Sequence, residues 1–223
     1  MILDEELYQN EPQYQRLNSR QVFKNIWINP RLVFQSIKQY STSSGILLFI
    51  FGILILPSVI SAFQLFSDPL IPTSGYYLGT VAGGVFGKLL VYFLYALMLW
   101  ITGMALKGKA NYSLLLRVVI IASIPSICYG AVSSIWNLVE MYTYSDEAEG
   151  MTGLLEQFPA AQTTGIVFSG IFGFWNMILV VVGVRTCQEF NTGKAVINVI
   201  LAILIFAIPA FGLFIAEDLG LRF

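Results

Sequence analysis

The sequence predicts an all-α membrane protein: a five-transmembrane helix bundle preceded by an N-terminal amphipathic interfacial helical segment. Of its 223 residues, 57% are hydrophobic and 11% are charged, against about 25% charged residues in an ordinary soluble domain. One soluble core of this size cannot cover so much apolar surface. The chain also contains five long apolar runs, each close to the roughly 20 residues that cross a bilayer as a helix.

The first 21 residues predict a flexible, acidic cytoplasmic tail. Asp4, Glu5 and Glu6 stand near its start, and no basic region precedes a short apolar core. The tail therefore lacks the pattern of a signal peptide. We expect the first span to remain uncleaved.

Residues 22–43 predict an amphipathic helical arm. Apolar side chains recur between Val22 and Trp27 at spacings that share one helix face. Asn29 and Pro30 are typical of a helix start, as N-cap and first helical residue. Each helix is too short and too charged to cross a bilayer. Two interpretations stay open: an interfacial anchor for the first span, or a cytoplasmic platform that packs under the bundle or meets a partner.

The membrane domain is expected over 44–216, followed by a short outer tail at 217–223. Its spans are predicted at 44–66, 79–106, 114–139, 164–184 and 195–216. The second run would measure about 42 Å as a helix, so its membrane part is expected after Val85. A break at Pro125 in the third run would reduce the count to four spans.

The distribution of basic residues predicts the orientation. Ten of the twelve Lys and Arg residues fall before the first run or near the second and fourth connections. The charged residues of the loop between the third and fourth runs are all acidic. By the positive-inside rule, the N-terminus is then cytoplasmic and the C-terminus is outside.

Small and polar residues within the runs suggest helix packing. Gly79, Gly83 and Gly87 share one helix face, which permits close approach of another helix. Asn137 and Asn176, each after a Trp, are candidates for hydrogen bonds between helices. Lys88 is open to two interpretations: a side chain that snorkels to the headgroups, or a buried functional cation.

Two stretches resemble the Yip1 domain family. IWINPRLVF resembles the family's opening motif, a Trp followed three residues later by Pro-Arg and then an aromatic residue. Here these are Trp27, Pro30, Arg31 and Phe34. The stretch 103–130 is similar to the second family motif, a Gly- and Lys-bearing turn followed by a span with a mid-helix proline. Where the family often has two glycines, this chain has Lys107-Gly108-Lys109.

The resemblance implies a non-enzymatic membrane protein. Eukaryotic members associate with Rab-type GTPases, and some bacterial members accompany ABC-type exporters. The compact loops favour a bacterial cytoplasmic (inner) membrane protein that acts as an accessory or scaffold subunit, with an ABC exporter or its adaptor as partner. Alternatives are a self-contained small-molecule or lipid transporter or channel, and a membrane-shaping or trafficking factor.

The expected partners are the lipid bilayer and another integral membrane protein, and no nucleic acid. Candidate contacts to lipid or partner are Trp27, Pro30, Arg31, Phe34, Lys107, Lys109 and Arg185. The chain has no histidine, which excludes histidine-dependent triads and histidine metal sites. We expect no catalytic residue, metal or cofactor.

Overall fold

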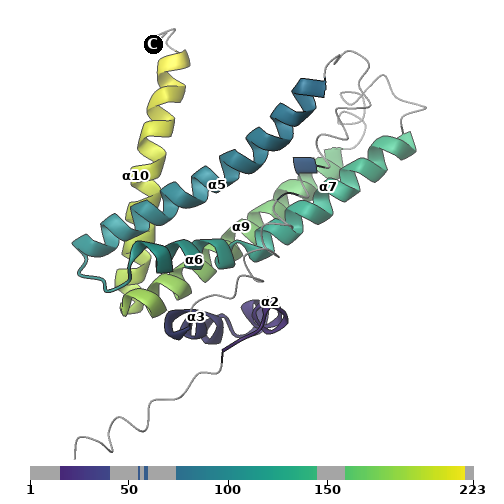
Figure 1. Cartoon of the computed structure of the whole chain (residues 1–223). Coiled ribbons are helices and arrows are strands. Elements are labelled where there is room, and N and C mark those ends of the chain that lie inside the picture. The colour runs from purple at the N-terminus through teal and green to yellow at the C-terminus, as the bar shows by residue number, and fades with distance from the viewer. Residues whose placement is uncertain (1–15, 41–54, 56–57, 60–73, 145–158, 219–223) are drawn as a thin grey trace, which may run out of the picture.

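The computed structural model describes residues 16–40, 55, 58–59, 74–144 and 159–218. Every regular element in this part of the chain is an α-helix, which confirms the predicted class. In chain order the helices are α2 (Ser19–Ile28), α3 (Pro30–Gln39), α5 (Ser74–Ala105), α6 (Tyr112–Ala122), α7 (Ile124–Tyr144), α9 (Pro159–Gln188) and α10 (Thr192–Asp218) (Figure 1).

The arm consists of two short helices whose starts are set by side-chain caps. At α2, the Gln21 N–H donates to Asn18 Oδ1 and the Asn18 N–H donates to Gln21 Oε1, both at 2.9 Å. At α3, Asn29 is the N-cap and Pro30 the first helical residue, as the sequence predicts. Satisfying these free N–H groups allows helices of only ten residues each to begin at fixed points.

The second arm helix packs against the bundle. Val33 and Phe34 are fully buried and Ile37 is 5% exposed, and α3 contacts both α6 and α9. Trp27 of α2 meets Phe172 of α9 edge to face, with ring centroids 6.3 Å apart. This geometry supports the platform interpretation of the arm.

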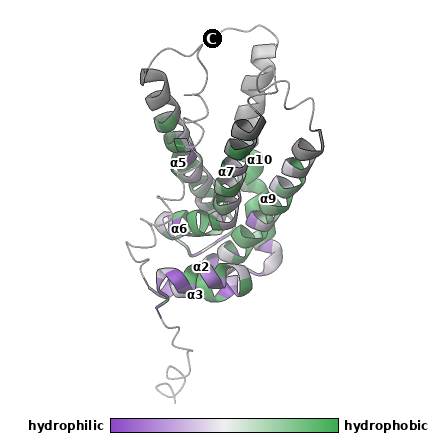
Figure 2. Cartoon of the chain, turned by 90° about the vertical axis from the view of Figure 1, so that its right-hand side faces the viewer, coloured by the Kyte–Doolittle hydropathy of each residue, from purple (hydrophilic) through white to green (hydrophobic). Residues whose placement is uncertain are grey.

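Three described stretches are long and apolar enough to cross a membrane: Val81–Ala105, Tyr112–Trp136 and Gly165–Gln188. Thr192–Ala207 of α10 is a shorter apolar helix among the described residues. Many large apolar side chains on α5, α9 and α10 are exposed, as suits helices that face lipid. Figure 2 colours stretches of these helices as hydrophobic. The predicted first span, 44–66, lies almost entirely outside the described residues, so the count of five stays a prediction.

The third predicted span is divided near Pro125 into two helices, α6 and α7. At Ser123 the backbone N–H donates to Val119 O at 3.1 Å and the hydroxyl donates to Ile120 O at 2.7 Å. Pro125 has no N–H with which to continue the helical ladder. As a result, α6 and α7 run in different directions (Figures 1 and 2). Tyr112–Trp136 still has the length and hydropathy of a span, so the break does not remove it from the candidates.

The core is centred on α6. Leu115, Val118, Ile121 and Ala122 are fully buried, because α6 packs against α3, α5 and α9. Gly183 of α9 permits this packing. A methyl group at Gly183 would collide with Val118 Cγ1 and lie 3.0 Å from Phe34 Cε1.

We predict that Gly183→Ala lowers the melting temperature of the detergent-purified protein. Overpacking a filled core costs about 1–3 kcal/mol, which outweighs the roughly 1 kcal/mol that alanine gains over glycine in a helix. The matched control is Gly173→Ala on the same helix, where no described atom lies within 4 Å of the added methyl group. Equal melting temperatures for the two variants would contradict this account of the core.

Candidate functional site

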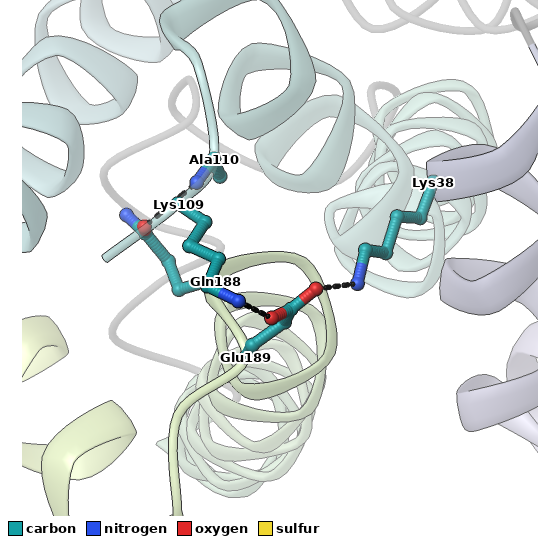
Figure 3. Close-up of polar contacts among 5 residues, drawn as sticks. All are labelled: Lys38, Lys109, Ala110, Gln188 and Glu189. Carbon is teal, nitrogen blue, oxygen red and sulfur yellow. Dashed lines mark hydrogen bonds and ion pairs between the residues drawn. The ribbon is translucent and has the colours of Figure 1, made fainter.

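The most interconnected polar region lies at the end of the bundle where the arm packs. Two turns meet there, 106–111 between α5 and α6, and 189–191 between α9 and α10. The Ala110 N–H donates to Gln188 Oε1 at 3.1 Å and joins the two turns (Figure 3). We call this region the basic end, because most of its charged side chains are Lys or Arg.

Gln188 fills a space that two glycines leave. It is 1% exposed, and its side chain occupies the positions where Cβ atoms of Gly103 and Gly108 would lie. Its Nε2 has no hydrogen-bond partner among the described residues. Gln188 therefore holds the end of α9 against the end of α5. Its side chain packs against Gly103 and Gly108, and its Oε1 accepts one hydrogen bond from the Ala110 N–H.

A second buried amide joins α10 to α5. Asn198 is fully buried. Its Nδ2 donates to Leu99 O at 3.3 Å, and its Oδ1 accepts from Thr102 Oγ1 at 3.4 Å. Interhelical hydrogen bonds of this kind are typical of membrane helices. They connect the two helices near the basic end.

Glu189 links three parts of the chain. Lys38 of α3 lies 2.6 Å from its Oε1, and Lys109 of the α5–α6 turn lies 2.6 Å from its Oε2 (Figure 3). Hydrogen bonds from Lys109 and Lys38, with the charges of both, lower the pKa of Glu189 to about 2. The carboxylate is partly exposed, so each pair contributes modestly to stability, about 0–1 kcal/mol.

Two residues at the basic end have left-handed backbone conformations. Lys107 has φ 64° and Glu189 has φ 59°. Each follows a helix that closes by a Schellman motif: the Gly108 N–H donates to Gly103 O at 2.8 Å, and the Phe190 N–H donates to Arg185 O at 3.1 Å. Glycine takes this conformation without strain, whereas other residues pay roughly 1 kcal/mol. Lys107 and Glu189 therefore occupy positions where a glycine would be unstrained.

The four predicted contact residues of the arm differ in how deeply they are buried. Phe34 is fully buried, and Trp27 and Pro30 are half-buried. Arg31 is exposed. Phe34 and Trp27 thus face the bundle, whereas Arg31 is free to meet lipid or a partner.

The three predicted basic contacts Lys107, Lys109 and Arg185 are all exposed at the basic end. The structure brings Lys107 and Lys109 beside the end of α9, which carries Arg185. The sequence did not single out Glu189, although it is the only acid in the segments 16–40, 106–111 and 185–194. A single acidic residue among basic segments is the sequence feature that could have identified Glu189.

The predicted glycine face of α5 packs against no described residue. No described atom lies within 4 Å of a methyl group added at Gly79, Gly83 or Gly87. By contrast, Gly84 lies against Ser58, whose Oγ would be 3.0 Å from an added methyl group. Close packing occurs instead at Gly103 of α5, Gly183 of α9 and Gly108 of the α5–α6 turn.

Of the remaining predicted packing residues, the structure describes the side chain of Asn176 but not that of Asn137. Asn176 Oδ1 is buried without a hydrogen-bond partner among the described residues. The side chain of Asn137 lies outside the described part. Lys88 on α5 is exposed, which is the placement that snorkelling requires.

No group of three or more His, Cys, Asp or Glu residues that could hold a metal ion occurs in the described part of the chain.

In comparisons with known proteins, residues 24–214 match the Yip1 domain. The chain belongs to the Yip1 domain family. With its apolar helices it is an integral membrane protein. No curated protein and no solved structure matches it.

We predict that Phe34→Ala releases the arm without unseating the spans. Losing a buried aromatic ring costs about 3–5 kcal/mol. The other contacts of two ten-residue helices are too few to offset that loss. Limited trypsin digestion after Arg20, Lys24 and Arg31, all exposed, measures the release. Trp27→Ala should have a smaller effect because Trp27 is only half-buried.

The control for arm release is Ile28→Ala, since Ile28 is 72% exposed at the end of α2. We expect it to digest like the unaltered protein. Unchanged protection of the arm in Phe34→Ala would show that Phe34 does not hold the arm in place.

A second prediction concerns the left-handed residues. Lys107→Gly should raise the melting temperature, because it removes about 1 kcal/mol of backbone strain. Glu189→Gly removes similar strain but also removes two ion pairs, so its gain should be smaller. A larger gain for Glu189→Gly would mean that the ion pairs do not stabilise the fold.

The difference between these two variants should depend on pH. The pKa of Glu189 is about 2 in the folded protein against an ordinary 4.5. A lowered pKa stabilises the fold above the unfolded value, and the effect is lost as the pH falls through the folded value. We therefore expect the difference to be constant above about pH 4.5 and to shrink towards pH 2.

Proposed function

We propose that this Yip1 domain protein is a non-enzymatic accessory or scaffold subunit of a membrane complex in the bacterial cytoplasmic membrane. An ABC-type exporter, or its adaptor, is the first candidate for the partner. The proposal combines the family's expected properties with two features of the structure, the chemistry of the interior and the lateral surface of α5.

Among the described residues, no Asp, Glu, Lys or Arg side chain is buried inside the bundle. Every buried polar residue among the described ones is uncharged: Ser36, Ser58, Thr102, Ser123, Gln188 and Asn198. Proton-coupled carriers use buried Asp, Glu or His side chains. A neutral interior therefore favours a role in assembly over self-contained transport.

The observation that carries the accessory role is the glycine face of α5. Gly79, Gly83 and Gly87 form a strip that no described helix covers. Strips of small residues let membrane helices approach closely, and van der Waals contact is the main attraction between helices in lipid. A helix of another membrane protein is the occupant that we propose.

We further propose five crossings with the basic end in the cytoplasm. The arm ends at the basic end, whereas α5 starts at the opposite end of the bundle (Figure 1). A first span between the arm and α5 is part of this proposal. The basic residues gathered at the arm's end fit the positive-inside rule.

The experiment is purification of the tagged protein from native membranes in mild detergent, with mass spectrometry of what accompanies it. We predict a stoichiometric membrane protein partner that is lost in the double variant Gly79→Leu/Gly83→Leu. The matched control, Gly170→Leu/Gly173→Leu on α9, changes two glycines that likewise contact no described residue and should keep the partner.

Three outcomes would count against the proposal. A partner retained in both variants would exclude the α5 glycine face as the interface. Recovery of the protein alone would favour self-contained transport, which reconstitution into vesicles would then measure. Recovery with lipid alone, together with altered vesicle shape, would favour a membrane-shaping role.

A further inference from the structure

Four basic side chains surround the two turns of the basic end. We call Lys107, Lys109, Arg185 and Lys194 the basic rim. All four are exposed. They come from segments that are distant in sequence but joined by the Ala110–Gln188 hydrogen bond and the Lys109–Glu189 ion pair (Figure 3). The folded structure, and not the local sequence, therefore brings these four basic residues to the same end of the bundle.

The rim stands where candidate spans begin and end. One span ends at Ala105, the next starts at Tyr112, and the third ends at Gln188. Residues this close to the ends of spans lie at the depth of lipid headgroups, which border a hydrocarbon core about 30 Å thick. Long basic side chains at such positions reach towards phosphates.

The positive charge of the rim is only partly neutralised. Glu189 pairs with Lys109 and with Lys38 of the arm. Lys107, Arg185 and Lys194 make no ion pair with any residue that the structure describes. Two helices end and two begin at this site, so their dipoles largely offset one another. The excess positive potential comes from the side chains.

We propose that the basic rim binds the phosphate headgroup of an anionic phospholipid. The ligand class follows from depth and charge, since phosphates are the anions present at the ends of spans, and clusters of Lys and Arg beside the ends of membrane helices bind such headgroups. Lys109, whose side chain is 73% exposed, borders the site and pairs with Glu189. This inference requires no protein partner and so stands apart from the proposed accessory role.

The purified full-length chain is titrated in detergent with phosphatidylglycerol or phosphatidylcholine, and bound lipids are counted by native mass spectrometry. We expect at least about tenfold tighter binding of phosphatidylglycerol, because each basic residue near an anionic surface adds roughly fivefold. Lys107→Gln/Lys194→Gln should lose about 25-fold of that affinity, roughly fivefold for each charge removed. This double variant keeps both Glu189 ion pairs, and an unchanged melting temperature will confirm that it folds.

The matched control is Arg20→Gln/Lys24→Gln, which removes the same charge from exposed positions of α2. We expect it to keep the phosphatidylglycerol affinity. An equal loss in both variants would show general attraction to the positive protein and overturn the rim. Equal binding of phosphatidylcholine and phosphatidylglycerol, or full affinity in the rim variant, would overturn it as well.

Discussion

The described architecture depends on one close contact, the meeting of α3, α6 and α9 at Gly183. The glycine leaves room for Val118 on one side and for the ring of Phe34 on the other. A larger residue would separate three helices at once, since neither neighbour has free space around it. Through this contact the arm is seated on the bundle, and Lys38 at the end of α3 comes within reach of Glu189.

The basic end shows how local strain and distant contacts are balanced. Lys107 and Glu189 take a conformation that favours glycine, yet each contributes a charge that glycine could not. Glu189 uses its charge to join the arm to the α5–α6 turn. Residues held in rare backbone conformations are common at functional sites because the surrounding structure fixes them. Here the Schellman bonds and the packing of Gln188 supply that constraint.

Sequence patterns predicted the helices well because lipid demands long apolar runs. Four of the predicted runs overlap the four described apolar segments, and the cap at Asn29 and Pro30 was predicted correctly. Pro125 was named as the place where the third run would break if it broke, since proline removes a specific backbone donor. Each of these features follows from residues close together in the chain.

The contacts between helices could not be predicted in the same way. Spacing drew attention to Gly79, Gly83 and Gly87, whereas the described helices meet at Gly103, Gly108 and Gly183. A glycine's role depends on which neighbour approaches it, and helix spacing says nothing of that neighbour. Likewise, the partners of Gln188 and Glu189 lie 78 to 151 residues away. No local pattern encodes such a distance.

That separation has a consequence for how the protein is made. The arm leaves the ribosome early, but its ion-pair partner Glu189 follows Lys38 by 151 residues. At about 5–20 residues per second, the arm waits roughly 8 to 30 s before its seat on α9 has been synthesised. Phe34 and Trp27 must be sheltered by the membrane surface or a chaperone during that interval. The arm can therefore dock only after α9 and Glu189 have been made, a stage that comes before the synthesis of α10.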